Sequence, residues 1–205
     1  MLNNEEDVES FKKKEENICD KIIDNIEFTT YHVKMTILLN LYIGGEGLLM
    51  VGNSLLTPVI ANVWNLSEFE KGFIGGTIFL GFTLGALFSG MISDKKGRKV
   101  AFVGGNMISL VGAIVGSFST SAWHLAVSNF LIGVGLGQSI PSIFSLCSEA
   151  TGDKVRNFLI NITFISFVAG EILVCLIARN YEIYNTSHSN WRILLYLRIF
   201  TVIIS

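Results

Sequence analysis

Glu46 is an acidic residue inside a long apolar run, and this position makes it the first candidate for functional chemistry. If the run spans a bilayer as a helix, a carboxylate that faces lipid costs roughly 2.5 kcal/mol or more. We therefore expect Glu46 to face a cavity, where it can bind a cationic solute or a proton. Helical spacing places Asn53 within about 60° of Glu46 on the same face. The alternative is a neutral Glu46 that packs against a neighbouring helix.

Two further charged residues, Glu171 and Arg198, also lie in apolar runs. They are expected to pair with each other or with Glu46, or to help hold a charged solute. Arg198 follows Arg192 by six residues, which is about 9 Å along a helix. Arg198 can therefore also extend to the membrane interface, and this alternative stays open.

Gln138, Ser142 and Ser145 share one face of a later apolar run, next to Pro141. Such a face can line a solute path or form hydrogen bonds between helices. Together these patterns define a candidate solute or ion pathway made of five residues: Glu46, Asn53, Gln138, Glu171 and Arg198.

Enzymatic chemistry has little support in the sequence. It offers no Ser–His–Asp set, no cluster of metal ligands and no phosphate-binding loop. The glycines at 133, 135 and 137 are not a nucleotide fingerprint, because no strand is expected before them. The cysteines at 19, 147 and 175 are too widely spaced for a disulfide framework or a metal site. We expect no catalytic residue, no metal and no cofactor.

Composition places these residues in a membrane. Half of the 205 residues are hydrophobic and 16% are charged, against about 25% in typical globular chains. Much of the charge is concentrated in a tail at residues 1–33, where acids alternate with lysines. These features exclude a soluble, nucleic-acid-binding or disordered protein. The remainder, residues 34–205, is expected to be an all-α integral membrane bundle.

The bundle is expected to contain six membrane spans. The apolar runs cover residues 35–63, 71–92, 100–118, 122–147, 158–178 and 191–205. The first five approach or exceed the ~20 residues that a helix needs to cross a bilayer, and lipid leaves no partner for an open strand edge. The sixth run is shorter and contains two arginines, so we expect it to be an incomplete span.

The distribution of basic residues predicts a cytosolic amino terminus. On the side of the tail lie Lys12, Lys13, Lys14, Lys21, Lys34, Lys95, Lys96, Arg98, Lys99, Lys154 and Arg156. On the opposite side lie Lys71, Arg179 and Arg192. Plasma membrane and internal membranes fit this pattern equally well.

A charged loop between the second and third runs carries the strongest local motif, from Gly90 through Asp94, Gly97 and Arg98 to Lys99. An acid at the carboxyl end of a helix opposes the helix dipole and needs a cationic partner. Arg98 suits this role because a guanidinium can hold a carboxylate with two hydrogen bonds. Gly97 allows the chain to turn into the third run.

This loop resembles the signature of the major facilitator superfamily, G-x-x-x-D-[RK]-x-G-R-[RK]. Between the fourth and fifth runs, Glu149 and Arg156 resemble the E-x-x-P-x-x-x-R element, with Gly152 in place of proline. Trp191-Arg192 is similar to the W-R that opens the sixth helix of sugar-porter-like members. The three matches occur in family order.

The first run is similar to the branch of synaptic-vesicle-glycoprotein-related and organic ion transporters, which carry an acid about twelve residues before a proline. Glu46 and Pro58 match this spacing. Two positions depart from the pattern: Leu49 replaces a second acid, and Asn129 replaces the arginine that usually precedes the glycines of the fourth helix.

The resemblance implies half of a secondary transporter: one six-helix bundle made of two inverted three-helix repeats, with the solute held against a second bundle. Transport of an organic ion or sugar-like solute by alternating access is the implied function, with Glu46 binding a cationic solute or a coupling proton. The implied gating residues are Gly90, Asp94, Gly97, Arg98, Lys99, Glu149 and Arg156.

The alternative is a truncated or half-size membrane protein that transports nothing and acts through helix–helix association. The expected partners are the lipid bilayer, a small-molecule solute, a coupling proton, and either a second six-helix half or a second copy as a homodimer. Nucleic acid is not expected.

Overall fold

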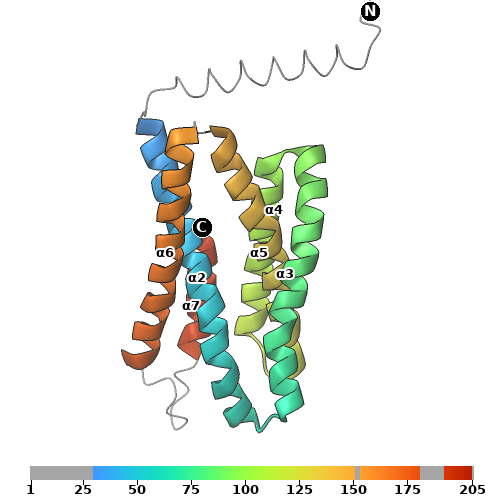
Figure 1. Ribbon diagram of the computed structural model, residues 1–205. Coiled ribbons are helices and arrows are strands. Elements are labelled where there is room, and N and C mark those ends of the chain that lie inside the picture. The colour runs from blue at the N-terminus through green and yellow to red at the C-terminus, as the bar shows by residue number, and fades with distance from the viewer. Residues whose placement is uncertain (1–29, 151–152, 181–191, 205) are drawn as a thin grey trace, which may run out of the picture.

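A computed structural model describes residues 30–150, 153–180 and 192–204. Most of the expected tail at 1–33 therefore lies outside the described residues, as does Trp191. The described part of the chain forms six α-helices and an elongated bundle (Figure 1). The helices are α2 (Thr30–Trp64), α3 (Glu68–Lys96), α4 (Arg98–Ser117), α5 (Ala122–Ala150), α6 (Asp153–Asn180) and α7 (Arg192–Ile204).

The helices match the six apolar runs in order, and the predicted all-α class is confirmed. Helices α2 to α6 are each long and apolar enough to cross a membrane. Most of them extend past the apolar run into polar residues; α3, for example, continues to Lys96. Helix α7 has 13 described residues, about 20 Å at 1.5 Å per residue, and is shorter than a full span.

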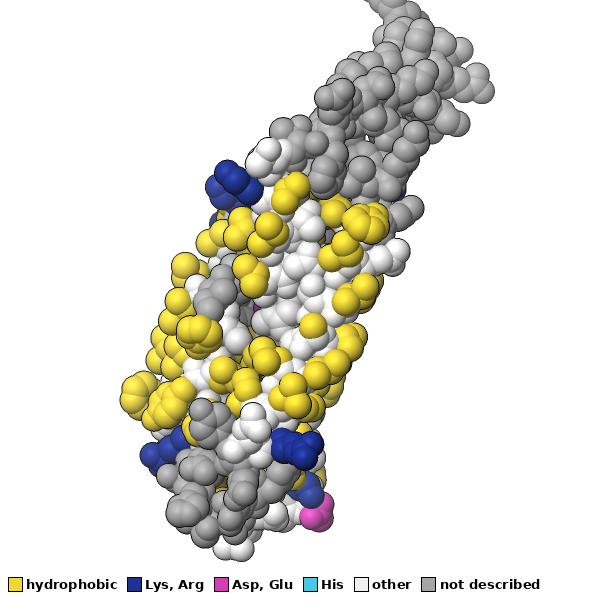
Figure 2. Space-filling model, turned by 90° about the vertical axis from the view of Figure 1, so that its left-hand side faces the viewer, with side chains coloured by type: hydrophobic (Ala, Val, Ile, Leu, Met, Phe, Trp, Pro, Cys, Tyr) yellow, Lys and Arg dark blue, Asp and Glu magenta, His cyan; other side chains and the backbone are white. Residues whose placement is uncertain are grey.

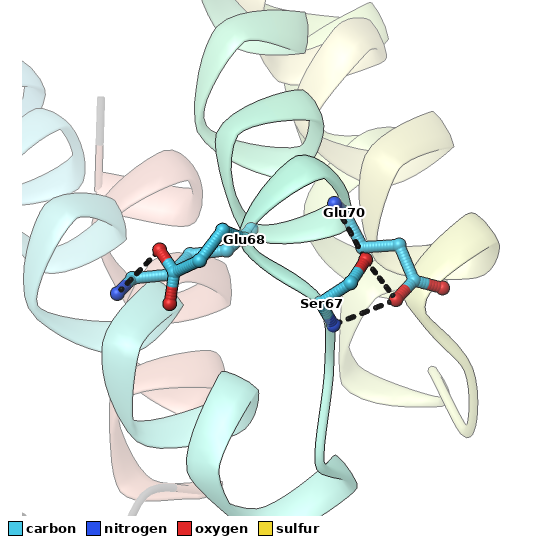
Figure 3. A network of polar contacts seen from close by, with 4 residues as sticks. Ser67, Glu68 and Glu70 are labelled. Atoms are coloured by element: carbon cyan, nitrogen blue, oxygen red, sulfur yellow. Dashed lines mark hydrogen bonds and ion pairs between the residues drawn. The ribbon is translucent and has the colours of Figure 1, made fainter.

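Helix α3 begins with a capping box that determines where the chain enters the bundle (Figure 3). The Glu70 amide donates to Ser67 Oγ at 3.3 Å, and the Ser67 amide donates to Glu70 Oε2 at 2.9 Å. These bonds satisfy amide groups that the first helical turn leaves without partners. In the same turn, Lys71 Nζ lies 3.5 Å from a carboxylate oxygen of Glu68.

The turn between α3 and α4 is made at Gly97, as the sequence predicts. Gly97 has a φ of 89°, which a residue with a Cβ adopts only with strain. Its amide donates to the Ser93 carbonyl and closes α3. Helix α4 starts at the next residue, so a single glycine reverses the chain.

Glycines bring helices into backbone contact in the pairs α3–α5, α4–α5 and α2–α6. In the pair α3–α5, a Cβ on Gly81 or Gly85 would overlap the backbone of α5, and one on Gly133 or Gly137 would overlap the backbone of α3. In the pair α2–α6, a Cβ on Gly170 would meet the backbone of α2. The first helix of each three-helix half thus packs against the second helix of the other half. This exchange is the arrangement expected of two related repeats.

The outer surface is apolar along the length of the bundle. Figure 2 shows hydrophobic side chains over the middle of the face that includes α6, with lysine and arginine side chains near the ends. Ile165, Val168 and Ile172 of α6 are among the exposed residues. A band of this kind suits contact with lipid or with another membrane helix, because exposing so much apolar surface to water is unfavourable.

Candidate functional site

Arg198 joins helices that are far apart in the sequence through one buried polar network. Its side chain extends from α7 into the bundle and is 2% exposed. Nη1 donates to Asn129 Oδ1 of α5 at 3.1 Å, and Nη2 donates to Asn53 Oδ1 of α2. Asn129 Nδ2 donates in turn to the Ile74 carbonyl of α3 at 3.1 Å. Four helices therefore share one set of hydrogen bonds.

This network corrects two expectations for Arg198. The guanidinium does not extend to the membrane interface, since it is buried inside the bundle. Its hydrogen-bond partners are two neutral amides, and neither Glu46 nor Glu171 is among them, so the alternative in which it pairs with an acid is wrong and its help in holding a charged solute stays a prediction. A buried charge needs hydrogen-bond partners, and here the side-chain oxygens of Asn53 and Asn129 are the acceptors.

A pocket of about 600 Å³ lies between α2, α3 and α6. Its apolar wall includes Met50, Pro58 and Phe79. Polar groups converge on it from all three helices: Asn53, Ser54, Thr57, Lys71 and Glu171. A largely apolar pocket with a few polar groups is the usual form of a small-molecule site.

Two of the five predicted pathway residues, Asn53 and Glu171, line this pocket. Arg198 reaches it indirectly, because it bonds to the side chain of Asn53. Glu46 and Gln138 are not among the lining residues. The structure therefore brings three of the predicted residues to one place, on one side of the bundle.

Glu46 lies deeper in the bundle and is 3% exposed. The Tyr42 hydroxyl one turn earlier faces Glu46 and Ser139, although neither this hydroxyl nor Glu46 Oε2 makes a hydrogen bond of normal length and angle within the described part of the chain. The Tyr42 ring packs edge-on against Phe102 of α4, with ring centroids 5.0 Å apart. Two buried polar atoms that face each other without a hydrogen bond of normal geometry mark a place where a proton, an ion or a water molecule can bind. That Glu46 faces a cavity stays a prediction.

Gln138 takes part in helix packing. Its Nε2 atom donates to the Ala101 carbonyl of α4 at 2.9 Å. On the same face of α5, Ser142 Oγ lies 3.1 Å from Ser89 Oγ and 3.3 Å from Ser93 Oγ of α3. These contacts match the alternative in which this face forms hydrogen bonds between helices.

The residues of the signature loop gather where α3 and α4 meet. Asp94 is exposed near the end of α3, Arg98 is half-buried at the start of α4, and Lys99 is exposed beside it. Gly90 is exposed one turn before Asp94. The predicted pairing of Asp94 with Arg98 stays a prediction.

The second motif lies at the same end of the bundle, because α5 ends and α6 begins beside the α3–α4 turn (Figure 1). Arg156 is half-buried in the first turns of α6. The side chain of Glu149 lies outside the described residues. The structure thus places both motifs at one end and leaves their contacts as predictions.

Sequence reasoning missed Lys71 and Asn129 as members of the site. By sequence, Lys71 is the first residue of the second apolar run and one of the basic residues on the side opposite the tail; in the structure α3 begins three residues before it, and Lys71 lines the pocket. The spacing of Lys71, Gly75 and Phe79 along one helical face was the available signal. Asn129 was noted as a departure from the family pattern, and nothing local in the sequence pointed to Arg198 as its partner.

The sequence model described as sugar (and other) transporter matches residues 14–205. The chain belongs to this family. This chain is a multi-pass membrane protein, because α2 to α6 are each long and apolar enough to span a bilayer.

Individual relatives of this chain are also named as transporters. The chain is 34% identical over 113 residues to the gentisate transporter of Corynebacterium glutamicum, covering 55% of this chain and 25% of the relative. It is 29% identical over 157 residues to the benzoate transport protein of Acinetobacter baylyi, covering 74% and 34%. The chain thus matches between a quarter and about a third of these relatives' length.

The fold has a counterpart among solved structures. The inward-open xylose transporter XylE from E. coli superimposes with a TM-score of 0.71 at 18% sequence identity. The match covers 84% of this chain and 46% of that chain. This likeness shows that the chain has the fold of about half of that transporter.

Proposed function

We propose that this chain forms one half of a secondary transporter that moves a small organic ion across a membrane by alternating access. The pocket between α2, α3 and α6 carries the proposal, because it offers about 600 Å³ with mixed polar and apolar walls. The named solutes of two relatives, gentisate and benzoate, are small aromatic acids. Benzoate is therefore the first solute to test, with a sugar such as xylose as the runner-up.

A second six-helix bundle is proposed to close this pocket. It can come from a longer polypeptide or from a second copy of this chain. The support is that this chain matches 46% of the xylose transporter, whose fold pairs two such halves around a central site. Rocking of the two bundles would expose the pocket to each side of the membrane in turn.

The remaining roles are proposed from the motifs. Glu46 exchanges a coupling proton or binds a cation, since its buried Oε2 atom faces the Tyr42 hydroxyl but makes no hydrogen bond of normal geometry within the described part of the chain. Asp94 and Arg98 form a charge lattice with Glu149 and Arg156 that opens and closes the cytosolic side. The amino terminus lies in the cytosol, in agreement with the basic residues near the α3–α4 turn.

Two neighbouring glycines provide a matched test of the pocket. Gly75 lines it, whereas Gly76 is not among the lining residues, and a Cβ at either position meets no atom within 4 Å. Gly75→Leu should fill the pocket and abolish benzoate uptake by proteoliposomes, while Gly76→Leu should leave uptake near the wild-type rate. Equal loss in both variants would count against the proposed pocket, and uptake by the wild type no faster than by protein-free liposomes would rule out a second copy of this chain as the closing bundle.

Helix–helix association without transport is the second candidate. The exposed apolar surface of α6, which includes Phe164 and Ile165, favours it because such a surface suits another membrane helix. Measurement of benzoate binding by the detergent-solubilised protein separates the two functions. Neither binding nor uptake would favour the association function, whereas binding with uptake would favour the transporter.

A further inference from the structure

The guanidinium of Arg198 is a buried positive charge whose hydrogen-bond partners within the described part of the chain are uncharged. Asn129 and Asn53 each accept one bond from it. A guanidinium has five N–H donors and interacts most strongly with a carboxylate, so two amide oxygens leave its charge uncompensated. Burying such a charge in the bundle costs free energy unless an anionic group interacts with it.

Asn53 connects this charge to the pocket. Its oxygen accepts from Arg198 Nη2, while the residue itself lines the pocket wall. The backbone carbonyl of Asn53 is held by the Thr57 hydroxyl at 2.9 Å, which fixes the position of this helical turn. The charge of Arg198 therefore lies one side chain behind the wall, in an interior where screening by water is weak.

The other charges of the pocket largely offset one another. Lys71 and Glu171 both line it and carry opposite charge. Lys71 is 40% exposed and lies beside Glu68, so water and a counter-ion weaken its field. Glu46 lies seven residues before Asn53, about 10 Å away along α2 by helical rise. Arg198 thus supplies the least screened positive charge near the pocket among the described residues.

We infer that Arg198 acts through Asn53 as a positioning residue that makes the pocket prefer solutes with a carboxylate over neutral solutes of the same shape. This inference rests on the proposed function of the pocket. The field of a fixed buried charge is already oriented before the solute arrives, so it favours the anion without reorganisation. A neutral amide in place of the carboxylate would receive little of this stabilisation.

The test compares benzoate with benzamide, which have the same ring and nearly the same size but differ in charge. Their dissociation constants are measured on the purified protein in detergent by equilibrium dialysis. Wild type should bind benzoate more tightly, and Arg198→Gln should reduce the ratio of the two affinities by about tenfold. Arg198→Lys keeps the charge and should keep most of the preference. Glu171→Gln removes a negative charge from the pocket and should increase the preference.

Asn53→Asp provides a second variant in case Arg198→Gln does not fold. It has the shape of asparagine, places a carboxylate next to Arg198 and neutralises its charge, so the preference for benzoate should fall as in Arg198→Gln. Unchanged affinity ratios in Arg198→Gln or Asn53→Asp, with both probes still bound, would overturn the inference and leave the pocket intact. Absence of binding of both probes to the wild type would instead overturn the proposed pocket together with this inference.

Discussion

Arg198 and Asn129 lie 69 residues apart in the sequence, yet Arg198 Nη1 donates to Asn129 Oδ1 at 3.1 Å in the interior of the bundle. Asn129 stands where the superfamily usually has an arginine in the fourth helix. In this chain Asn129 instead accepts a hydrogen bond from a guanidinium that α7 supplies.

Replacing Asn129 with leucine should destabilise the bundle. The variant removes an acceptor from the buried guanidinium and a donor from the Ile74 carbonyl. Loss of a hydrogen bond to a charged group costs about 1.5–3 kcal/mol. Thermal unfolding in detergent should therefore show a clearly lower midpoint. Asn161→Leu, at an exposed position on α6, is the matched control and should change the midpoint little. Equal midpoints for the two variants would refute a stabilising role for the network.

The contact between α3 and α5 predicts a second stability effect. A Cβ on Gly137 would overlap the Phe82 carbonyl of α3, so Gly137→Ala forces the two helices apart. Overpacking of this kind typically costs about 1–3 kcal/mol. Gly72→Ala is the control, because its Cβ meets nothing within 4 Å and alanine favours a helix. The unfolding midpoint should fall in the first variant and stay equal or rise in the second. A midpoint unchanged by Gly137→Ala would mean that the helices separate at no cost.

Much of the fold could be predicted because it depends on local pattern. The six apolar runs predict the six described helices, and Gly97 predicts the turn between α3 and α4. Both features follow from the cost of burying polar backbone in lipid and from the conformational freedom of glycine. No knowledge of which helices touch is required for either.

The site could be predicted less well because it depends on which helices touch. Helical spacing placed Glu46 and Asn53 on one face, but only Asn53 is among the residues lining the pocket. The hydrogen-bond partners of Arg198 come from two helices that are distant in the sequence. From the sequence alone, a charged side chain near the end of a helix is equally compatible with a position at the membrane–water interface. Gln138 donates to the α4 backbone, a contact that no local pattern distinguishes from pocket lining.

The capping box of α3 predicts an effect at the entrance to the pocket. Ser67→Ala removes the oxygen that accepts from the Glu70 amide, a change that typically costs about 1 kcal/mol. The first turn of α3 also carries Lys71, so fraying should make this lysine less well ordered. Amide hydrogen exchange of the first turn should become faster in Ser67→Ala, whereas Thr120→Ala, at an exposed loop position, should leave that exchange unchanged. Identical exchange in both variants would contradict a capping role.

Glu46 offers a test of proton coupling that leaves the pocket lining untouched. If its carboxyl exchanges a proton during transport, Glu46→Gln should remove most of the dependence of benzoate uptake on an imposed pH gradient. Glutamine keeps nearly the same volume at this buried position, so a packing defect is a weak explanation for such a change. The control is Glu68→Gln, since Glu68 is exposed and pairs with Lys71 outside the bundle interior. Uptake in proteoliposomes should keep its pH dependence in Glu68→Gln and lose it in Glu46→Gln. Retained pH dependence in Glu46→Gln would remove this carboxyl from the coupling step and leave it a structural role.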